Sequence, residues 1–106
     1  MINITFHPKT LELKIEGHAG HGKKGEDIVC AAISTLFYTL VEALQQSADM
    51  MSSPLSYDDK YGQGYIKCSP KEEYMGNVVR TYWTILVGME LVANNYPDNV
   101  TFQVRG

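Results

Sequence analysis

The chain has 106 residues, 44% of them hydrophobic and 20% charged, which is ordinary for one soluble globular domain. A formal net charge of -3 and a pI near 5.5 argue against general nucleic-acid binding, which needs a basic face to neutralise phosphates. The first residues lack the basic and long apolar regions of a signal peptide, and no run approaches the roughly 18 uninterrupted apolar residues of a membrane helix. We therefore expect a single domain over residues 1–106, in the cytoplasm and without membrane association.

Two alternating segments open the chain and predict a pair of antiparallel strands. Apolar and polar residues alternate over residues 2–6 and again over 11–16, and the turn between them contains Pro8. The next segment, residues 17–25, holds four glycines in nine residues, which predicts a mobile loop or backbone positions with positive φ.

A helix is expected from Asp27, a good N-cap residue, to about Gln46. Its apolar stripe is widened by Phe37, Tyr38 and Val41 well beyond a single face. A helix that is apolar nearly all round is central in the fold or shared with a partner. The stripe itself consists of Val29, Ile33, Leu36, Leu40 and Leu44.

The second half predicts two short strands over residues 55–57 and 65–68, a second helix, and a last strand over residues 100–104. The residues from Ser69 to Glu72 have the pattern of a capping box, with Pro70 at the first helical position. Pro97 predicts that the helix ends at about Asn95. We expect Gly88 to allow close packing on Ala31 or Ala32 of the first helix. The predicted apolar stripe of the second helix consists of Val79, Tyr82, Trp83, Leu86 and Met89.

The element order is thus ββαββαβ. We predict an α+β fold in two layers, with a mostly antiparallel sheet and two long helices packed on one of its faces.

Cys30 is the candidate nucleophile of the chain. With Asp27 as the N-cap, Cys30 would lie in the first helical turn, where unpaired amides and the positive helix end favour a thiolate. A first-turn amide would also be a candidate oxyanion donor. His18 lies twelve residues earlier, within reach of the sulfur across a loop, and a Cys–His pair suffices for nucleophilic acyl transfer. Asp27 or Glu26 would orient the imidazole, and Ser34 shares the helix face of Cys30 one turn later.

Plainer structural interpretations of these residues stand beside the catalytic one. A lone cysteine in an apolar run is most often a small buried hydrophobe, and Asp27 is most simply a helix cap. Ser34 would then bond back to a carbonyl four residues earlier. Cys68 follows a short predicted strand, and we expect it in the core, reduced and unpaired with Cys30 in the cytoplasm.

Two other kinds of site use the same loop. The spacing of Gly17, Gly22 and Lys23 matches most of a phosphate-binding P-loop, but Lys24 stands where a metal-binding Ser or Thr belongs. His18, His21 and Cys30 would supply three zinc ligands, although their spacing matches no common structural zinc signature. A further alternative is a noncatalytic dimeric module in which the loop grips a peptide without cutting it.

The segments Gly17-His18-Ala19 and Gly25-x-Asp27-Ile-Val-Cys30-Ala-Ala-Ile-Ser34 resemble the signature of the Prp family of ribosomal-processing cysteine proteases. About ten positions agree in order and spacing, within an 18-residue span. The resemblance implies a small homodimeric cysteine peptidase that uses no cofactor or metal, with Cys30 as nucleophile and His18 as general base. Asp27 and Ser34 match the supporting positions of the family.

The resemblance also implies a substrate. It is a short N-terminal extension of the large-subunit ribosomal protein number twenty-seven, cut after aromatic residues. The loop that would close over this peptide contains Gly17, Ala19, Gly20, Gly22 and Gly25. His21 makes this loop more basic than expected and offers a rival base. Relatives in prophages act on capsid or scaffold proteins, and a prophage origin is the alternative for this chain.

Overall fold

The computed structural model describes residues 1–17, 24–60 and 63–106, with side chains for all of these except 24–27. The observed order of strands and helices is the predicted ββαββαβ, with two added 3₁₀ helices, η1 and η2. The elements are β1 (Ile2–His7), β2 (Glu12–Glu16), α1 (Lys24–Gln46), η1 (Ala48–Met50), β3 (Ser56–Asp58), β4 (Gln63–Lys67), η2 (Glu72–Tyr74), α2 (Met75–Asn95) and β5 (Val100–Val104).

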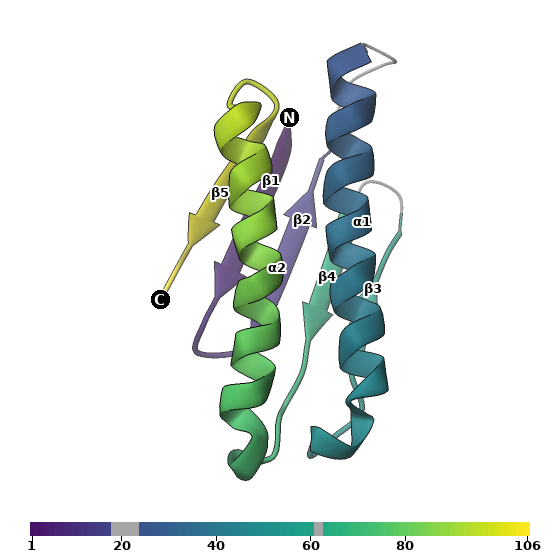
Figure 1. Ribbon diagram of the computed structural model, residues 1–106, viewed down its shortest axis with the longest axis vertical. Helices are drawn as coiled ribbons and strands as arrows, with labels where there is room; N and C mark the ends of the chain where they lie inside the picture. The colour runs from purple at the N-terminus through teal and green to yellow at the C-terminus, as the bar shows by residue number, and fades with distance from the viewer. Residues whose placement is uncertain (18–23, 61–62) are drawn as a thin grey trace.

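The strands form one sheet in the order β3-β4-β2-β1-β5. The β1–β2, β2–β4 and β3–β4 pairs are antiparallel, whereas β5 runs parallel to β1. Both helices cover the same face of this sheet (Figure 1). The structure therefore confirms the predicted two-layer α+β fold with a mostly antiparallel sheet.

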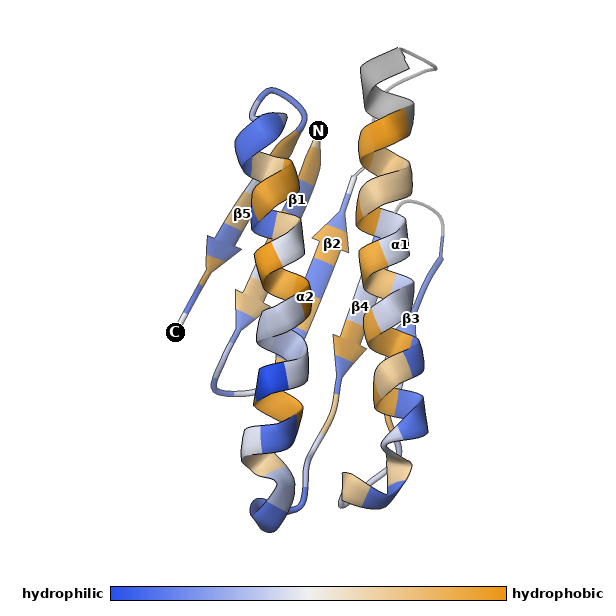
Figure 2. Ribbon diagram, in the orientation of Figure 1, coloured by the Kyte–Doolittle hydropathy of each residue, from blue (hydrophilic) through white to orange (hydrophobic). Residues whose placement is uncertain are grey.

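The core lies between the sheet and the two helices. Because side chains alternate between the faces of a strand, every second residue of the central strands points at the helices. Ile4 pairs with Ile15 across β1 and β2, and Leu13 pairs with both Phe6 and Ile66 on its two neighbours. All five are buried, and Figure 2 shows apolar residues recurring along both helices and the central strands.

Helix α1 begins at Lys24, so Asp27 lies inside the helix and is not its N-cap. Acidic residues are favoured throughout the first helical turn as well as at the N-cap. The presence of Asp27 alone therefore could not distinguish a helix that begins at Asp27 from one that begins at Lys24. Cys30 lies six residues beyond the helix start, where the amide belongs to the intrahelical hydrogen-bond ladder. The expectation of unpaired first-turn amides at Cys30 was therefore wrong.

The apolar stripe of α1 is buried within the chain, whereas Ile28 and Tyr38 on the same helix are 58% and 48% exposed. Ile33, Phe37 and Val41 are buried together with Val29, Leu40 and Leu44, and Leu36 packs partly buried against them. Among the described residues, the part of α1 from Ile28 to Gln46 is long and apolar enough to cross a membrane, judged by length and composition alone. Because its apolar stripe belongs to the core between the two helices and the sheet, we identify α1 as a core helix of this domain.

Helix α2 begins at Met75, after η2, and the predicted capping box at Ser69 is wrong. The Ser69 carbonyl accepts hydrogen bonds from the Ser52 amide at 2.8 Å and the Ser52 hydroxyl at 2.7 Å. Pro70 forms a bridge with Met51. This long-range pairing keeps the segment extended until η2. The predicted end of the helix at Asn95 is confirmed.

The buried face of α2 differs in part from the predicted stripe. Tyr82, Leu86 and Met89 are buried as expected, but Val79 is only half-buried and Trp83 is 39% exposed. Val78 and Ile85 complete the buried face together with Ala93.

Gly88 does mark close packing of the two helices. A Cβ atom there would stand 2.9 Å from Cδ2 of Leu36, so the contact is with Leu36 and not with Ala31 or Ala32.

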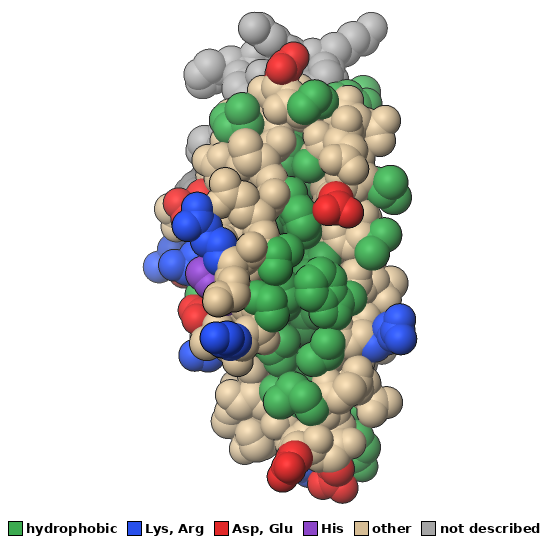
Figure 3. Space-filling view, turned by 90° about the vertical axis from the view of Figure 1, so that its left-hand side faces the viewer, with side chains coloured by type: hydrophobic (Ala, Val, Ile, Leu, Met, Phe, Trp, Pro, Cys, Tyr) green, Lys and Arg blue, Asp and Glu red, His purple; other side chains and the backbone are tan. Residues whose placement is uncertain are grey.

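Apolar side chains also gather on the outer face that α2 shares with β5. Trp83, Val87 and Leu91 occupy every fourth position of α2 and are 39%, 57% and 58% exposed. Val104 on β5 is 45% exposed. Figure 3 shows hydrophobic side chains forming a continuous band on this side of the molecule. We call Trp83, Val87, Leu91 and Val104 the α2–β5 patch. Patches of this kind on a monomer mark interaction surfaces.

We predict opposite effects of alanine at two glycines. Gly17 has a φ of +97°, and a Cβ there would collide with the Met1 carbonyl oxygen, so Gly17→Ala should destabilise the fold by about 1–3 kcal/mol. Gly76, in the first turn of α2, has nothing within 4 Å of an added Cβ. Gly76→Ala should therefore stabilise by about 0.5–1 kcal/mol.

Urea unfolding of both variants and the native chain at one protein concentration checks these changes. A shift of the unfolding midpoint with an unchanged slope measures the change in stability. A Gly17→Ala midpoint equal to that of the native chain would contradict the geometry of the β2 end.

Candidate active site

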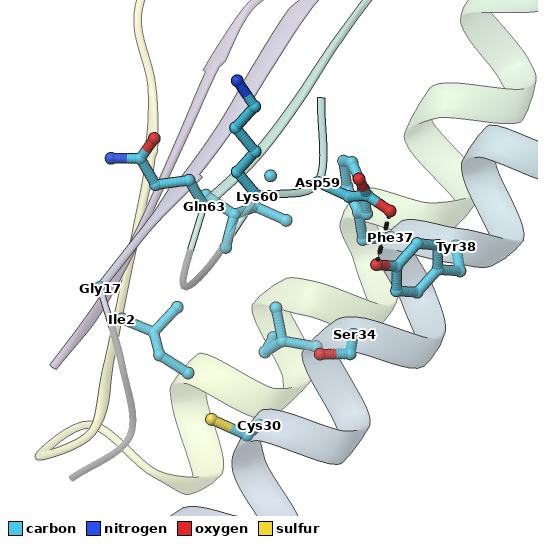
Figure 4. Close-up of a pocket in the computed structure, with 12 residues that line it drawn as sticks. Ile2, Gly17, Cys30, Ser34, Phe37, Tyr38, Asp59, Lys60 and Gln63 are labelled. Carbon is cyan, nitrogen blue, oxygen red and sulfur yellow. Dashed lines mark hydrogen bonds between the residues drawn. The ribbon is translucent and has the colours of Figure 1, made fainter. Parts of the chain in front are cut away.

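A pocket of about 240 Å³ opens beside Cys30. One side is the face of α1, the other is the β3–β4 hairpin, and the first residue of β1 and the end of β2 close its base (Figure 4). Its volume falls below the roughly 300–1,000 Å³ of small-molecule sites, which suits one or two side chains of a peptide.

Helix α1 contributes a regular row of side chains to this pocket. Cys30, Ser34 and Tyr38 are spaced four residues apart, and all three line the pocket. Cys30 is half-buried, while Ser34 and Tyr38 are exposed. The predicted common face of Cys30 and Ser34 is therefore confirmed.

The floor of the pocket is apolar. Ile2, Ile15, Ile33 and Phe37 line it, and each is at most 8% exposed. The Phe37 ring lies against the backbone of Gly64 on β4, where an added Cβ would stand 3.2 Å from the ring. A glycine at this position therefore lets α1 approach the sheet and sets the depth of the pocket.

The opposite rim is polar and comes from the hairpin. The Tyr38 hydroxyl donates a hydrogen bond to Oδ2 of Asp59 at 3.0 Å, which joins α1 to the hairpin. The Lys60 amide donates to Oδ1 of Asp58 at 3.0 Å, and the Lys60 carbonyl accepts from the Gln63 amide at 2.8 Å. The hydrogen bond to Asp59 raises the pKa of Tyr38, and partial burial adds to the effect, so this hydroxyl stays protonated at neutral pH.

The structure brings three of the predicted site residues together: Gly17, Cys30 and Ser34. Gly25 and Asp27 lie in the first part of α1, and the Asp27 side chain is outside the described residues. His18, Ala19, Gly20, Gly22 and the rival base His21 are also outside them.

Sequence reasoning missed the far side of the pocket. Phe37 and Tyr38 were interpreted only as a widening of the apolar stripe, and Asp59 and Lys60 only as a connection between strands. These residues meet in a tertiary contact between α1 and the β3–β4 hairpin, which periodicity along one segment does not reveal.

Cys68 has a different environment from Cys30 and is confirmed as a core residue. It is 4% exposed, and its Sγ accepts a 3.5 Å hydrogen bond from the hydroxyl of the buried Tyr82. Burial raises the pKa of Cys68, although the Tyr82 hydroxyl partly offsets this. Both cysteines are free.

The phosphate-loop and zinc alternatives gain no support from the described part of the chain. Both neighbours of β2 in the sheet are antiparallel to it, so the strand before the glycine-rich segment does not open a parallel βαβ unit. No three His, Cys, Asp or Glu side chains among the described residues are grouped as metal ligands. A half-buried thiol beside an apolar floor instead suits attack on a peptide.

We predict that a thiol reagent distinguishes the two cysteines. Cys30 lines an open pocket, whereas Cys68 is buried and its raised pKa leaves little thiolate. Ellman's reagent should react rapidly with one thiol of the native chain and with two in guanidinium chloride. The fast phase should vanish in Cys30→Ala and persist in Cys68→Ala. A fast phase that survives Cys30→Ala would contradict this assignment.

Comparison with known proteins identifies the family of the chain. Residues 1–101 match the family model described as Cysteine protease Prp. The chain is 26% identical over 98% of its length to the ribosomal processing cysteine protease Prp of Staphylococcus aureus strain Mu50, of which 95% is covered.

Solved structures share the fold. A crystal structure of the S. aureus protease Prp with a covalently linked product peptide superposes with a TM-score of 0.77 at 24% identity, covering 99% of this chain and 100% of that one. The structure of SMU.848 from Streptococcus mutans is 34% identical with a TM-score of 0.68, covering 97% and 90% of the two chains. The family model spans nearly the whole chain, and the chain therefore belongs to the Prp family of cysteine proteases.

Proposed function

We propose that this protease removes a short N-terminal extension from a large-subunit ribosomal protein, number twenty-seven, in the cytoplasm. The observation that carries the proposal is the position of Cys30 at a pocket sized for peptide side chains, in a chain of the Prp family. Ribosomal processing is the activity in the name of the S. aureus relative, and it sets the substrate class proposed here.

The proposed mechanism is acyl transfer through Cys30. His18 takes the proton of the Cys30 thiol, the resulting thiolate attacks the carbonyl carbon of the scissile peptide bond, and His18 passes the proton to the leaving amine as the C–N bond breaks. Water then attacks the thioester and loses a proton to His18. As the C–S bond breaks, His18 returns this proton to the sulfur, and the extension leaves with a new carboxylate.

We propose supporting roles for the remaining predicted residues. Asp27 orients the His18 imidazole, and Ser34, which lines the pocket one turn after Cys30, places its hydroxyl near the reacting groups. Gly17 borders the same pocket, and we propose that the segment it begins, which includes Ala19, Gly20, Gly22 and Gly25, contacts the bound peptide.

The floor of the pocket suits an aromatic side chain next to the cleavage site. The residues that line it are apolar and at most 8% exposed: Ile2, Ile15, Ile33 and Phe37. Burying an aromatic ring there removes its apolar area from water, and the contact with Phe37 adds aromatic packing. This chemistry supports cleavage after aromatic residues.

We also propose that the protein acts as a homodimer joined through the α2–β5 patch. Of the residues of α1 that first suggested a dimer, Phe37 and Val41 are buried within the chain and Tyr38 is exposed. The α2–β5 patch is instead exposed, and its Trp83 and Leu91 are of the kind that fills interface cores. A two-fold axis would place the patch of one copy against that of the other.

We predict that cleavage depends on Cys30 and His18. With the extended ribosomal protein as substrate, Cys30→Ala should abolish cleavage and His18→Ala should slow it by about 10²-fold or more. Cys68→Ala serves as the matched control and should stay within about threefold of the native rate. His21→Ala, which tests the rival base, should slow cleavage less than His18→Ala does.

Product masses and rates by mass spectrometry provide the measurement. Cleavage that survives Cys30→Ala, or that is lost only with Cys68→Ala, would overturn the mechanism. Cleavage of a phage head protein but not of the ribosomal protein would overturn the substrate and support the prophage alternative.

We predict that the native chain sediments as a dimer of its 11.9 kDa subunit and that Leu91→Glu shifts it towards the monomer. Ile28→Glu on α1 is the matched control, because Ile28 and Leu91 are both 58% exposed. Analytical ultracentrifugation provides the measurement. A native monomer would refute the dimer, and dissociation by Ile28→Glu alone would place the interface on α1.

A further inference from the structure

The pocket beside Cys30 has a second, polar end that the cleavage reaction does not use. There the Tyr38 hydroxyl on α1 donates its 3.0 Å hydrogen bond to Oδ2 of Asp59 on the hairpin (Figure 4). Tyr38 is 48% exposed and Asp59 is exposed, so a bound peptide can reach both. We call this hydrogen-bonded pair the Tyr38–Asp59 clasp.

The spacing along α1 places the clasp relative to a substrate. Cys30 and Tyr38 line the same pocket, with Ser34 between them. Eight residues of helix at about 1.5 Å each separate the two ends by about 12 Å. An extended peptide advances about 3.3 Å per residue. A peptide that follows α1 from Cys30 therefore brings its third or fourth residue from the scissile bond to the clasp.

The clasp presents an acceptor of hydrogen bonds to such a residue. Tyr38 has one hydroxyl hydrogen, and it is engaged with Asp59. An ionised carboxylate has about four lone-pair sites, so Asp59 retains capacity for further donors. Figure 4 shows the Lys60 side chain directed away from this carboxylate. Charge-assisted hydrogen bonds to an ionised acceptor are stronger than neutral ones, and a second carboxylate in the same place is repelled.

Both partners of the clasp are held in place before a peptide arrives. The Phe37 and Tyr38 rings are in edge contact, with centroids 5.5 Å apart. On the hairpin, the hydrogen bond from the Lys60 amide to Asp58 fixes the turn next to Asp59. A preorganised acceptor costs little ordering entropy on binding.

We infer that the Tyr38–Asp59 clasp is a specificity subsite for a hydrogen-bond-donating side chain, an amide or a basic group, three or four residues from the scissile bond. The inference rests on the proposed peptidase function, and it adds a polar requirement to the apolar one at the pocket floor.

The test is a set of peptides spanning the cleavage site of the extended ribosomal protein. Lys, Gln, Leu and Glu are placed in turn at the third and fourth positions on each side of the scissile bond, and kcat/KM is measured for each. At one of these positions the native enzyme should prefer Lys and Gln over Glu by about tenfold or more. Asp59→Asn should reduce this preference to about twofold, and Asp59→Lys should reverse it.

Tyr38→Phe removes the hydroxyl that fixes Asp59. It should raise KM for the preferred peptide several-fold at nearly unchanged kcat, since the reacting groups are untouched. Asp49→Asn is the matched control for Asp59→Asn, because Asp49 is exposed and does not line the pocket. Its Lys-over-Glu preference should equal that of the native enzyme.

The outcomes separate the two claims. If the enzyme cleaves the parent peptide and Asp59→Asn leaves the Lys-over-Glu preference unchanged, the subsite is overturned. The peptidase function is then still supported. A native enzyme that does not cleave the parent peptide at all overturns the peptidase function, and the subsite with it.

Discussion

The packing of one face of α1 onto the sheet is the constraint on which the site depends. Ile33 and Phe37 are fixed in the core, at 3% and 4% exposure, and they leave α1 only one rotation about its axis. Cys30, Ser34 and Tyr38 lie at the edge of that buried face and are therefore directed along the pocket. Apolar burial, which carries no chemical specificity of its own, thus determines where the Cys30 sulfur lies.

The glycines at the contacts of α1 permit this packing. Gly64 lets the Phe37 ring lie on β4, and Gly88 lets Leu36 approach α2. An added Cβ would stand 3.2 Å from the Phe37 ring at Gly64 and 2.9 Å from Cδ2 of Leu36 at Gly88, so these side chains of α1 would have to shift. The position of Cys30 therefore depends in part on Gly64, which lines the pocket, and on Gly88, which does not.

The sequence predicted the elements whose signals are local. Alternation identified β1 and β2, and helical spacing identified α1 and α2, because these patterns reflect burial on one face. The start of α2 was not predictable from Ser69 and Pro70, since the Ser69 carbonyl pairs with Ser52, seventeen residues earlier. The Tyr38–Asp59 clasp was missed for the same reason. The predicted nucleophile came from an ordered motif, and the pocket around it came only from tertiary contacts.

The central claim is that Cys30 carries the peptide as a thioester during turnover. Acid quenching of the enzyme during cleavage of the extended ribosomal protein, followed by tandem mass spectrometry, tests it directly. The account predicts an adduct on Cys30 with the mass of the N-terminal extension less one water. An adduct on Cys68, or steady cleavage with Cys30 unmodified at every quench time, would contradict it.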